Sequence, residues 1–177
     1  MSRQIITSLV SRGLRTVDRF APPAAAHAHC DIPCGIYDPH LAQIAALTVL
    51  RMDQLIEALG ELPSGASKAD ADKWHNSFAR YVLVKEEHGE LCKREIRVIW
   101  GDYFKPEHAE KFPELHTLVW NILKLGGKNR QEVNKAAAEE LLGQVQRFAE
   151  IFWETKGVAS KRQPSNQAVG GELVVPA

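Results

Sequence analysis

The chain has 177 residues, of which 45% are hydrophobic and 25% are charged, and its 22 basic residues are balanced by 22 acidic ones. This size and apolar content suit one globular domain with its own core and make a second folded domain unnecessary. A formal net charge of 0 argues against a nucleic-acid-binding protein, which needs a basic excess to contact phosphates. No apolar run is long enough to span a bilayer, so the sequence predicts a soluble protein with no membrane partner.

Residues 1–28 differ in composition from the rest of the chain. They contain four arginines and one acid, Asp18, so their net charge is +3 and that of the remaining residues is −3. An Arg-rich, acid-poor start that ends in a Pro/Ala-rich run is typical of a removable leader. Its apolar stretch is short and interrupted, which argues against a secretory signal. We therefore expect a propeptide and a cytoplasmic mature protein, or an organellar one if the source is eukaryotic.

A short segment rich in metal donors follows this leader: His29-Cys30-Asp31-Ile32-Pro33-Cys34-Gly35-Ile36-Tyr37. Pro33 forces a turn between the two sulfurs, and Gly35 permits a backbone geometry that a side chain would block. Thiolate sulfur beside nitrogen donors suits a late first-row metal, nickel(II) or copper(II), and not calcium or magnesium. The pattern predicts a metal-binding hook, with Tyr37 placed to gate small ligands or to hydrogen-bond them.

Four amphipathic helices are predicted after the hook. The first begins at Asp38-Pro39 and runs to Gly60, with an apolar stripe made of Leu41, Ile44, Thr48, Met52, Leu55 and Leu59. The second runs from about Lys68 to Trp100, and an ordered loop follows it. The third begins at Pro113 and should end at Gly126-Gly127, and the fourth runs from about Arg130 to Lys156.

No stretch of the sequence alternates as a strand would. The predicted fold class is therefore all-α, an antiparallel four-helix bundle with an N-terminal metal-binding hook. We expect residues 29–157 to form the hook and bundle domain. Residues 158–177, which are rich in Pro, Gly and polar side chains, should be a flexible C-terminal tail or an intersubunit arm.

The hook resembles that of the nickel superoxide dismutase family, His-Cys-x-x-Pro-Cys-Gly-x-Tyr. Further blocks are similar to that family in the same order along the chain: Asp38-Pro39, Gly101-Asp102-Tyr103-Phe104-Lys105-Pro106, Phe112-Pro113-Glu114-Leu115-His116 and Ile151-Phe152-Trp153-Glu154-Thr155-Lys156. Together these blocks cover residues from His29 to about Lys156. Several separated blocks are far more specific than one short cysteine motif.

The resemblance implies a superoxide dismutase with nickel as its cofactor and His29, Cys30 and Cys34 as metal ligands. Cleavage after Ala28 would free the α-amine of His29 as a donor, and that amine, the Cys30 amide nitrogen and both thiolates would hold the metal, with the His29 imidazole as an axial ligand. Thiolate donors make the higher oxidation state of nickel accessible. Tyr37, Asp31, Pro33 and Tyr103 are the residues predicted to act in catalysis.

The same resemblance implies partners as well as chemistry. Superoxide would be the substrate, a peptidase would remove the leader, and the chain would assemble as a homohexamer. The sequence departs from well-known bacterial members at two positions, where Ala45 stands for a glutamate and His88 for an arginine that support the hook histidine. We expect His88 to be a packed polar residue and Cys92 to be a small buried hydrophobic residue.

Other interpretations of the hook remain open from the residues alone. A nickel or copper storage or delivery protein could use the same hook without turnover. The two cysteines could instead form a reversible disulfide in a thiol-redox module. A structural zinc site fits less well, because no second Cys/His pair at suitable spacing supplies the four protein ligands that it needs.

Overall fold

The computed structural model describes residues 35–177, so the leader and the hook residues His29 to Cys34 lie outside the described part of the chain. Its helices are α2 (His40–Leu59), α3 (Lys68–Val98), the π-helical turn η1 (Ile99–Tyr103), α4 (Pro106–Lys111), α5 (Leu115–Gln131) and α6 (Lys135–Thr155). Two strands follow, β1 (Ser160–Pro164) and β2 (Glu172–Pro176). The mostly helical fold that the sequence predicts is confirmed.

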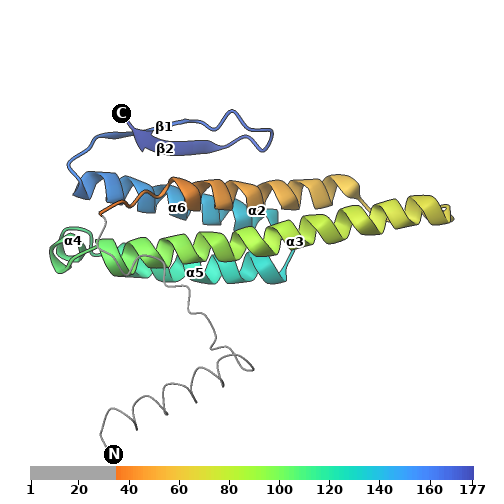
Figure 1. Ribbon diagram of the computed structural model, residues 1–177, viewed down its shortest axis with the longest axis horizontal. Helices are drawn as coiled ribbons and strands as arrows, with labels where there is room; N and C mark the ends of the chain where they lie inside the picture. The colour runs from red at the N-terminus through yellow and green to blue at the C-terminus, as the bar shows by residue number, and fades with distance from the viewer. Residues whose placement is uncertain (1–34) are drawn as a thin grey trace, which may run out of the picture. The chain divides into compact units, whose positions relative to one another are not determined.

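Four long helices, α2, α3, α5 and α6, form what we call the helical body. In this body, α2 packs against α3 and α6, and α5 packs against the same two helices. Successive long helices run in opposite directions (Figure 1). With 31 residues, α3 is about 46 Å long at 1.5 Å per residue. Its N-terminal end extends beyond the other helices (Figure 1).

Polar side chains define where three of these helices begin. Asp38 Oδ1 accepts a hydrogen bond from the backbone N–H of His40 at 2.7 Å. The hydroxyl of Ser67 caps α3 by accepting from the backbone N–H of Asp70, and Asn134 caps α6 in the same way. Each cap satisfies a backbone donor that the first helical turn leaves unpaired. The predicted starts of the first two helices are correct to within one residue.

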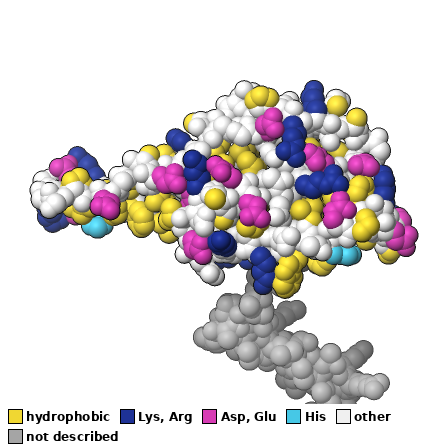
Figure 2. Space-filling view, turned by 180° about the vertical axis from the view of Figure 1, so that it is seen from behind, with side chains coloured by type: hydrophobic (Ala, Val, Ile, Leu, Met, Phe, Trp, Pro, Cys, Tyr) yellow, Lys and Arg dark blue, Asp and Glu magenta, His cyan; other side chains and the backbone are white. Residues whose placement is uncertain are grey.

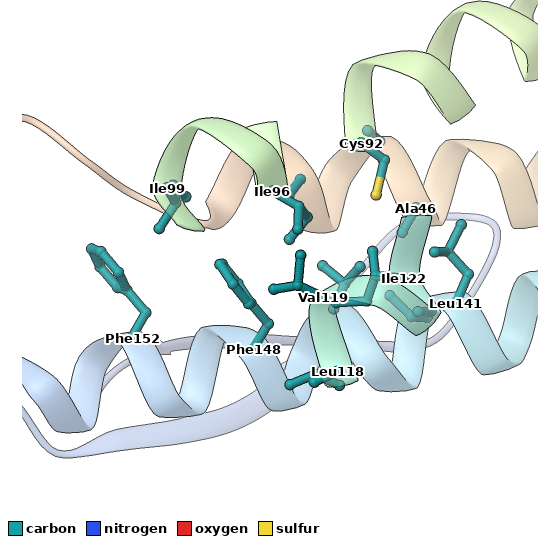
Figure 3. Close-up of a cluster of buried hydrophobic side chains, with 14 of the residues drawn as sticks. Ala46, Cys92, Ile96, Ile99, Leu118, Val119, Ile122, Leu141, Phe148 and Phe152 are labelled. Atoms are coloured by element: carbon teal, nitrogen blue, oxygen red, sulfur yellow. The ribbon is translucent and has the colours of Figure 1, made fainter. Parts of the chain in front are cut away.

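The core of the helical body lies where α3, α5 and α6 face one another and α2. Figure 3 shows Phe148 and Phe152 of α6 pointing toward Ile96 of α3 and Ile99 of η1, with side chains of α5 beside them. All four side chains are almost completely buried. Burying one large apolar side chain contributes about 1.5–3 kcal/mol, so this layer fixes the end of the body at which η1 lies.

The predicted apolar stripe of the first helix is not its most buried face. Leu41 is 45% exposed, and half of the buried apolar side chains of α2 are alanines: Ala42, Ala45, Ala46, Leu47, Val49 and Leu50. Alanines let neighbouring helices approach closely, and α2 packs against both α3 and α6. The larger residues of the predicted stripe stand at the margin of that contact.

The predicted end of the third helix at Gly126-Gly127 is wrong, because α5 continues to Gln131. A Cβ atom at Gly126 would come within 2.7 Å of the side chain of Lys93 on α3, and one at Gly89 would come within 2.8 Å of Arg130. Glycine is therefore required here by the close approach of two helices. Its ordinary role as a helix stop is overridden by packing.

A buried ion pair joins α2 to α3 at the opposite end of the body. Lys85 and Asp53 have side chains that are 2% and 0% exposed, and Lys85 Nζ lies 3.3 Å from Asp53 Oδ1. Lys85 also donates to the backbone carbonyl of Glu132, and Asp53 Oδ2 accepts from the backbone N–H of Asn134. Burial raises the pKa of Asp53 even though the charge of Lys85 acts to lower it. The pair thereby anchors the link between α5 and α6.

The C-terminal segment, expected to be a flexible tail without strands, forms an antiparallel hairpin instead. β1 pairs with β2 from Ser160 opposite Pro176 to Pro164 opposite Glu172. Figure 1 shows the hairpin lying along α6 and α2. The prediction failed because the segment is polar and rich in turn residues, and its strand is short: of β2, only Leu173 and Val174 are buried.

Hydrogen bonds from buried glutamines attach this hairpin to the helical body. Gln43, which is fully buried on α2, donates to the carbonyl of Val174 at 3.0 Å and accepts from the N–H of the same residue at 2.7 Å. Gln146 of α6 donates to the carbonyl of Glu172 at 2.8 Å. The hairpin is thus held by both helices on which it lies.

The surface carries charges of both signs. Figure 2 shows acidic and basic side chains interspersed over one face, without a field of one sign that would suit a polyanionic partner. Within residues 35–177, no helix is long and apolar enough to cross a membrane.

Candidate functional site

Two of the predicted catalytic residues lie side by side in the structure. The ring centroids of Tyr37 and Tyr103 are 5.7 Å apart, with the rings tilted by 52°. Tyr37 precedes α2, and Tyr103 is the last residue of η1, so segments far apart in the sequence meet here. Asp31 and Pro33, the other two predicted catalytic residues, lie outside the described residues, as do the predicted metal ligands His29, Cys30 and Cys34.

Aromatic packing holds the ring of Tyr103 on several sides. The centroid of Phe152 on α6 lies 4.7 Å away, and that of Phe104 lies 5.2 Å away. The imidazole of His108 on α4 stacks on Tyr103 at 5.7 Å with an interplanar angle of 24°. Lys156 Nζ lies 5.5 Å from the centroid of the Tyr103 ring. Such contacts each contribute about 0.5–1.5 kcal/mol, so together they restrain the ring.

The Tyr103 hydroxyl has a partner on α6. Its oxygen lies 2.9 Å from Oγ1 of Thr155, the last residue of that helix. Sequence reasoning did not single out Thr155 or His108 as site residues. Thr155 lies in one of the blocks that resemble the dismutase family, which is the signal that could have found it.

The π-helical turn explains how Tyr103 reaches this position. In η1 the backbone N–H of Phe104 donates to the carbonyl of Ile99 at 3.3 Å, so one residue more than in an α-helical turn is enclosed. π-helical turns are rare and are found frequently at functional sites. The predicted ordered loop after the second helix thus consists of η1 and the short helix α4.

His108 connects α4 to the tyrosine pair. Its Nδ1 accepts a hydrogen bond from the backbone N–H of Lys105 at 3.2 Å, so in the neutral ring the proton is on Nε2. The imidazole is therefore fixed both by this bond and by stacking on Tyr103. The arrangement is a closed aromatic cluster at one end of the helical body.

The two positions that depart from bacterial family members lie in ordinary packing environments. Ala45 is fully buried in the core. His88 is half-buried, and its Nδ1 lies 2.8 Å from the carbonyl of Val84 one turn earlier on the same helix. The expectation that His88 is a packed polar residue agrees with this contact.

Cys92, the one cysteine within the described residues, is fully buried among apolar side chains. Burial raises the pKa of its thiol to about 12, and the negative charge of Glu95 acts in the same direction. The thiol is therefore protonated near neutral pH and a poor metal ligand or nucleophile. The expectation of a small buried hydrophobic residue is confirmed.

Metal donors are not gathered anywhere in residues 35–177, where no group of three or more His, Cys, Asp and Glu side chains could hold a metal ion.

A pocket of about 670 Å³ lies beside η1 and is lined by Trp100, Phe104, Leu115 and His116, among others. Neither Tyr37 nor Tyr103 lines it. The indole N–H of Trp100 donates to Nδ1 of His116 at 3.0 Å, so the Nδ1 atom of this histidine already accepts a hydrogen bond.

The chain matches known proteins over most of its length. Residues 24–156 match the family model of nickel-containing superoxide dismutase. The nickel superoxide dismutase of Streptomyces coelicolor is 39% identical over 137 residues, which cover 77% of this chain and 95% of the relative. That of Streptomyces seoulensis is 36% identical over the same coverage.

Solved structures give the same result. A crystal structure of nickel-containing superoxide dismutase after partial X-ray-induced reduction superimposes with a TM-score of 0.63 at 36% identity, covering 73% of this chain and 99% of that one. The native structure of a nickel superoxide dismutase at 1.30 Å gives a TM-score of 0.62.

Fold and sequence together thus define a metal-dependent oxidoreductase built on packed helices. The chain belongs to the nickel-containing superoxide dismutase family. Family membership indicates nickel as the cofactor and favours a dismutase over a metal storage or delivery protein.

Proposed function

We propose that this protein disproportionates superoxide into dioxygen and hydrogen peroxide at a nickel ion held by His29, Cys30 and Cys34. The observation that carries the proposal is the family match over residues 24–156, which includes the whole hook. Because residues 35–177 contain no group of side chains that could hold a metal, the donors are sought in the hook. Two cysteines and a histidine within six residues are a donor set that suits nickel.

Nickel would supply the one-electron redox chemistry, and the rest of the chain would support it. Cys34 is three residues before Tyr37, so their Cα atoms are at most about 11 Å apart along the chain. Tyr37 in turn packs against Tyr103. We infer that the tyrosine pair borders the reaction site, restricts access to it and forms hydrogen bonds with small species that enter. Asp31 and Pro33 would shape the hook itself.

Superoxide is small, so its reaction needs no large cavity. The pocket beside η1 is therefore not required for the activity.

The functional unit that we propose is an antiparallel four-helix bundle carrying an N-terminal hook. Removal of residues 1–28 by a peptidase would expose the α-amine of His29 and so complete the donor set.

We also propose a homohexamer in the cytoplasm as the mature form. Support comes from large apolar side chains that the isolated chain leaves exposed: Trp120 is 61% exposed, Leu83 57% and Leu41 45%. Burial of such side chains between subunits would stabilise an assembly. Multi-angle light scattering at several protein concentrations tests this point, and a monomer throughout would contradict it.

The activity is tested with a chain that begins at His29 and is loaded with nickel. We expect superoxide to decay faster than it does spontaneously, in proportion to bound nickel. The matched control begins at Ala28, one residue earlier, and lacks only the free His29 amine; Cys30→Ser removes one thiolate. Both controls should lose the nickel-dependent decay.

A storage or delivery protein would give a different result. It would bind nickel, release it readily to a competing chelator and leave superoxide decay unchanged. Such an outcome with the chain that begins at His29 would refute the proposed function.

A further inference from the structure

The hydrogen bond between Tyr103 and Thr155 has a direction that the surrounding atoms determine. Thr155 Oγ1 lies 2.7 Å from the backbone carbonyl of Phe152 and 2.9 Å from the Tyr103 hydroxyl. A carbonyl oxygen can only accept, so the single hydroxyl proton of Thr155 points to Phe152. Thr155 then has only lone pairs left for its second contact. Tyr103 is therefore the donor in its bond to Thr155.

We propose that Thr155 is a positioning residue for the dismutase reaction. It fixes the Tyr103 phenol so that the phenolic oxygen offers lone pairs, and not its proton, to species entering the site. This inference rests on the proposed function. The ring cannot easily turn away from Thr155, since Phe152 and His108 pack against it. The hydroxyl proton of Tyr103 is thus held in its hydrogen bond to Thr155 of α6.

The direction of this bond affects what Tyr103 can bind. Superoxide is an anion and accepts hydrogen bonds, so Tyr103 could donate to it only by releasing Thr155. Hydrogen peroxide and water carry protons and can donate to the phenolic oxygen as it stands. Tyr103 is therefore suited to the protonated product and to ordered water. Donors to the incoming anion must come from elsewhere at the site.

Thr155→Val is the variant that tests the assignment. Valine has the shape of threonine and is also β-branched, but it has no hydroxyl. The carbonyl of Phe152 keeps a hydrogen bond from the backbone N–H of Lys156 at 3.3 Å, so the helix end stays paired. Thr155→Ser retains the hydroxyl and serves as the matched control.

The first readout is the tyrosine ¹³Cζ NMR spectrum of the full-length, nickel-free chain. The chain has three tyrosines, and Tyr103→Phe identifies the Tyr103 signal. We expect Thr155→Val to shift that signal, Thr155→Ser to leave it near the wild-type position, and the signal of Tyr81 to stay in place in both. An unmoved Tyr103 signal in Thr155→Val would overturn the assigned hydrogen bond.

The second readout is superoxide decay by the nickel-loaded protein. Loss of one neutral hydrogen bond corresponds to about a five-fold change in rate. We therefore expect the rate of superoxide decay to fall by about that factor in Thr155→Val and to recover in Thr155→Ser. An unchanged rate in Thr155→Val, beside a shifted NMR signal, would overturn the positioning role. A wild-type protein without activity would instead refute the proposed function, while the NMR result would still report on the bond.

Discussion

Gln43 offers the sharpest test of how the C-terminal hairpin is attached. Its side chain is fully buried and exchanges two hydrogen bonds with the backbone of Val174, one through each polar atom of the amide. The perturbation is Gln43→Ala. It removes both bonds and leaves a buried N–H and a buried carbonyl of β2 without these partners.

The expected cost follows from those two groups. A buried polar group that loses its partner costs about 1–3 kcal/mol, so two of them should lower the free energy of unfolding by about 3 kcal/mol. For a chain of 177 residues, this corresponds to a melting temperature lower by about 6–12 °C. Urea denaturation followed by circular dichroism measures the free energy directly.

Gln54→Ala is the matched control. Gln54 also lies on α2 and also bonds to the C-terminal segment, but it makes one half-buried hydrogen bond, to the carbonyl of Val169 at 3.1 Å. Its loss should cost about 1 kcal/mol. In a chain that ends at Gly157, Gln43→Ala should have almost no effect, because its partner has been removed.

Equal losses for the two variants in the full chain would refute the reasoning. So would an effect of Gln43→Ala that persists undiminished after truncation. Either result would mean that the hairpin is not attached through this glutamine.

Three further predictions concern charges and thiols. Lys85→Met should lower the free energy of unfolding by about 3–5 kcal/mol, because it leaves Asp53 buried without its counter-ion. The double variant Lys85→Met/Asp53→Leu should recover most of this loss in the same urea assay. A double variant no more stable than the single one would contradict the prediction. Cys92, whose thiol pKa burial raises to about 12, should resist iodoacetamide at pH 8 in the folded protein and react only after unfolding, as peptide mass spectrometry will show; modification of Cys92 at native conditions would count against the packed core. The hydrogen bond from Arg147 holds the pKa of Glu114 below its ordinary value of 4.5, so the pair stabilises the folded state above that pH, and the gain is lost as the pH falls through the lowered value. Because both side chains are nearly half exposed, Arg147→Gln should cost less than about 1 kcal/mol at pH 7 and less than that at pH 2, and an equal cost at both would be inconsistent with the ion pair.

Much of the helical fold was predictable because its signals are local. The Asp38-Pro39 start signal and the helical spacing of apolar residues are contained within single segments of sequence, although the spacing did not identify the most buried face of α2. The end of α5 was not predictable in this way. Whether Gly126 stops a helix or lets α3 approach depends on Lys93, a residue on another helix, and that contact exists only in the folded chain.

The hairpin was missed for a similar reason. β2 has only two buried side chains, and its polar backbone groups are paired partly by glutamines from α2 and α6. Short strands stabilised by distant side chains carry too weak an alternation to be recognised.

The donor types and spacing of the hook predicted a metal site with Tyr37 beside it, whereas Tyr103 was predicted only through resemblance. The pairing of Tyr37 with Tyr103 agrees with the prediction that both belong to one site. Neither the spacing of the residues nor their types indicates that Thr155 and His108 contact Tyr103, because these contacts depend on the geometry of η1 and α4.

A native mass spectrum of the protein purified from its own cells tests the central claim most directly, because it reports the N-terminus, the bound metal and the subunit number together. The account predicts hexamers of chains that begin at His29, each with one nickel ion. Chains that retain residues 1–28 and carry zinc, or metal-free chains with a disulfide between Cys30 and Cys34, would contradict it.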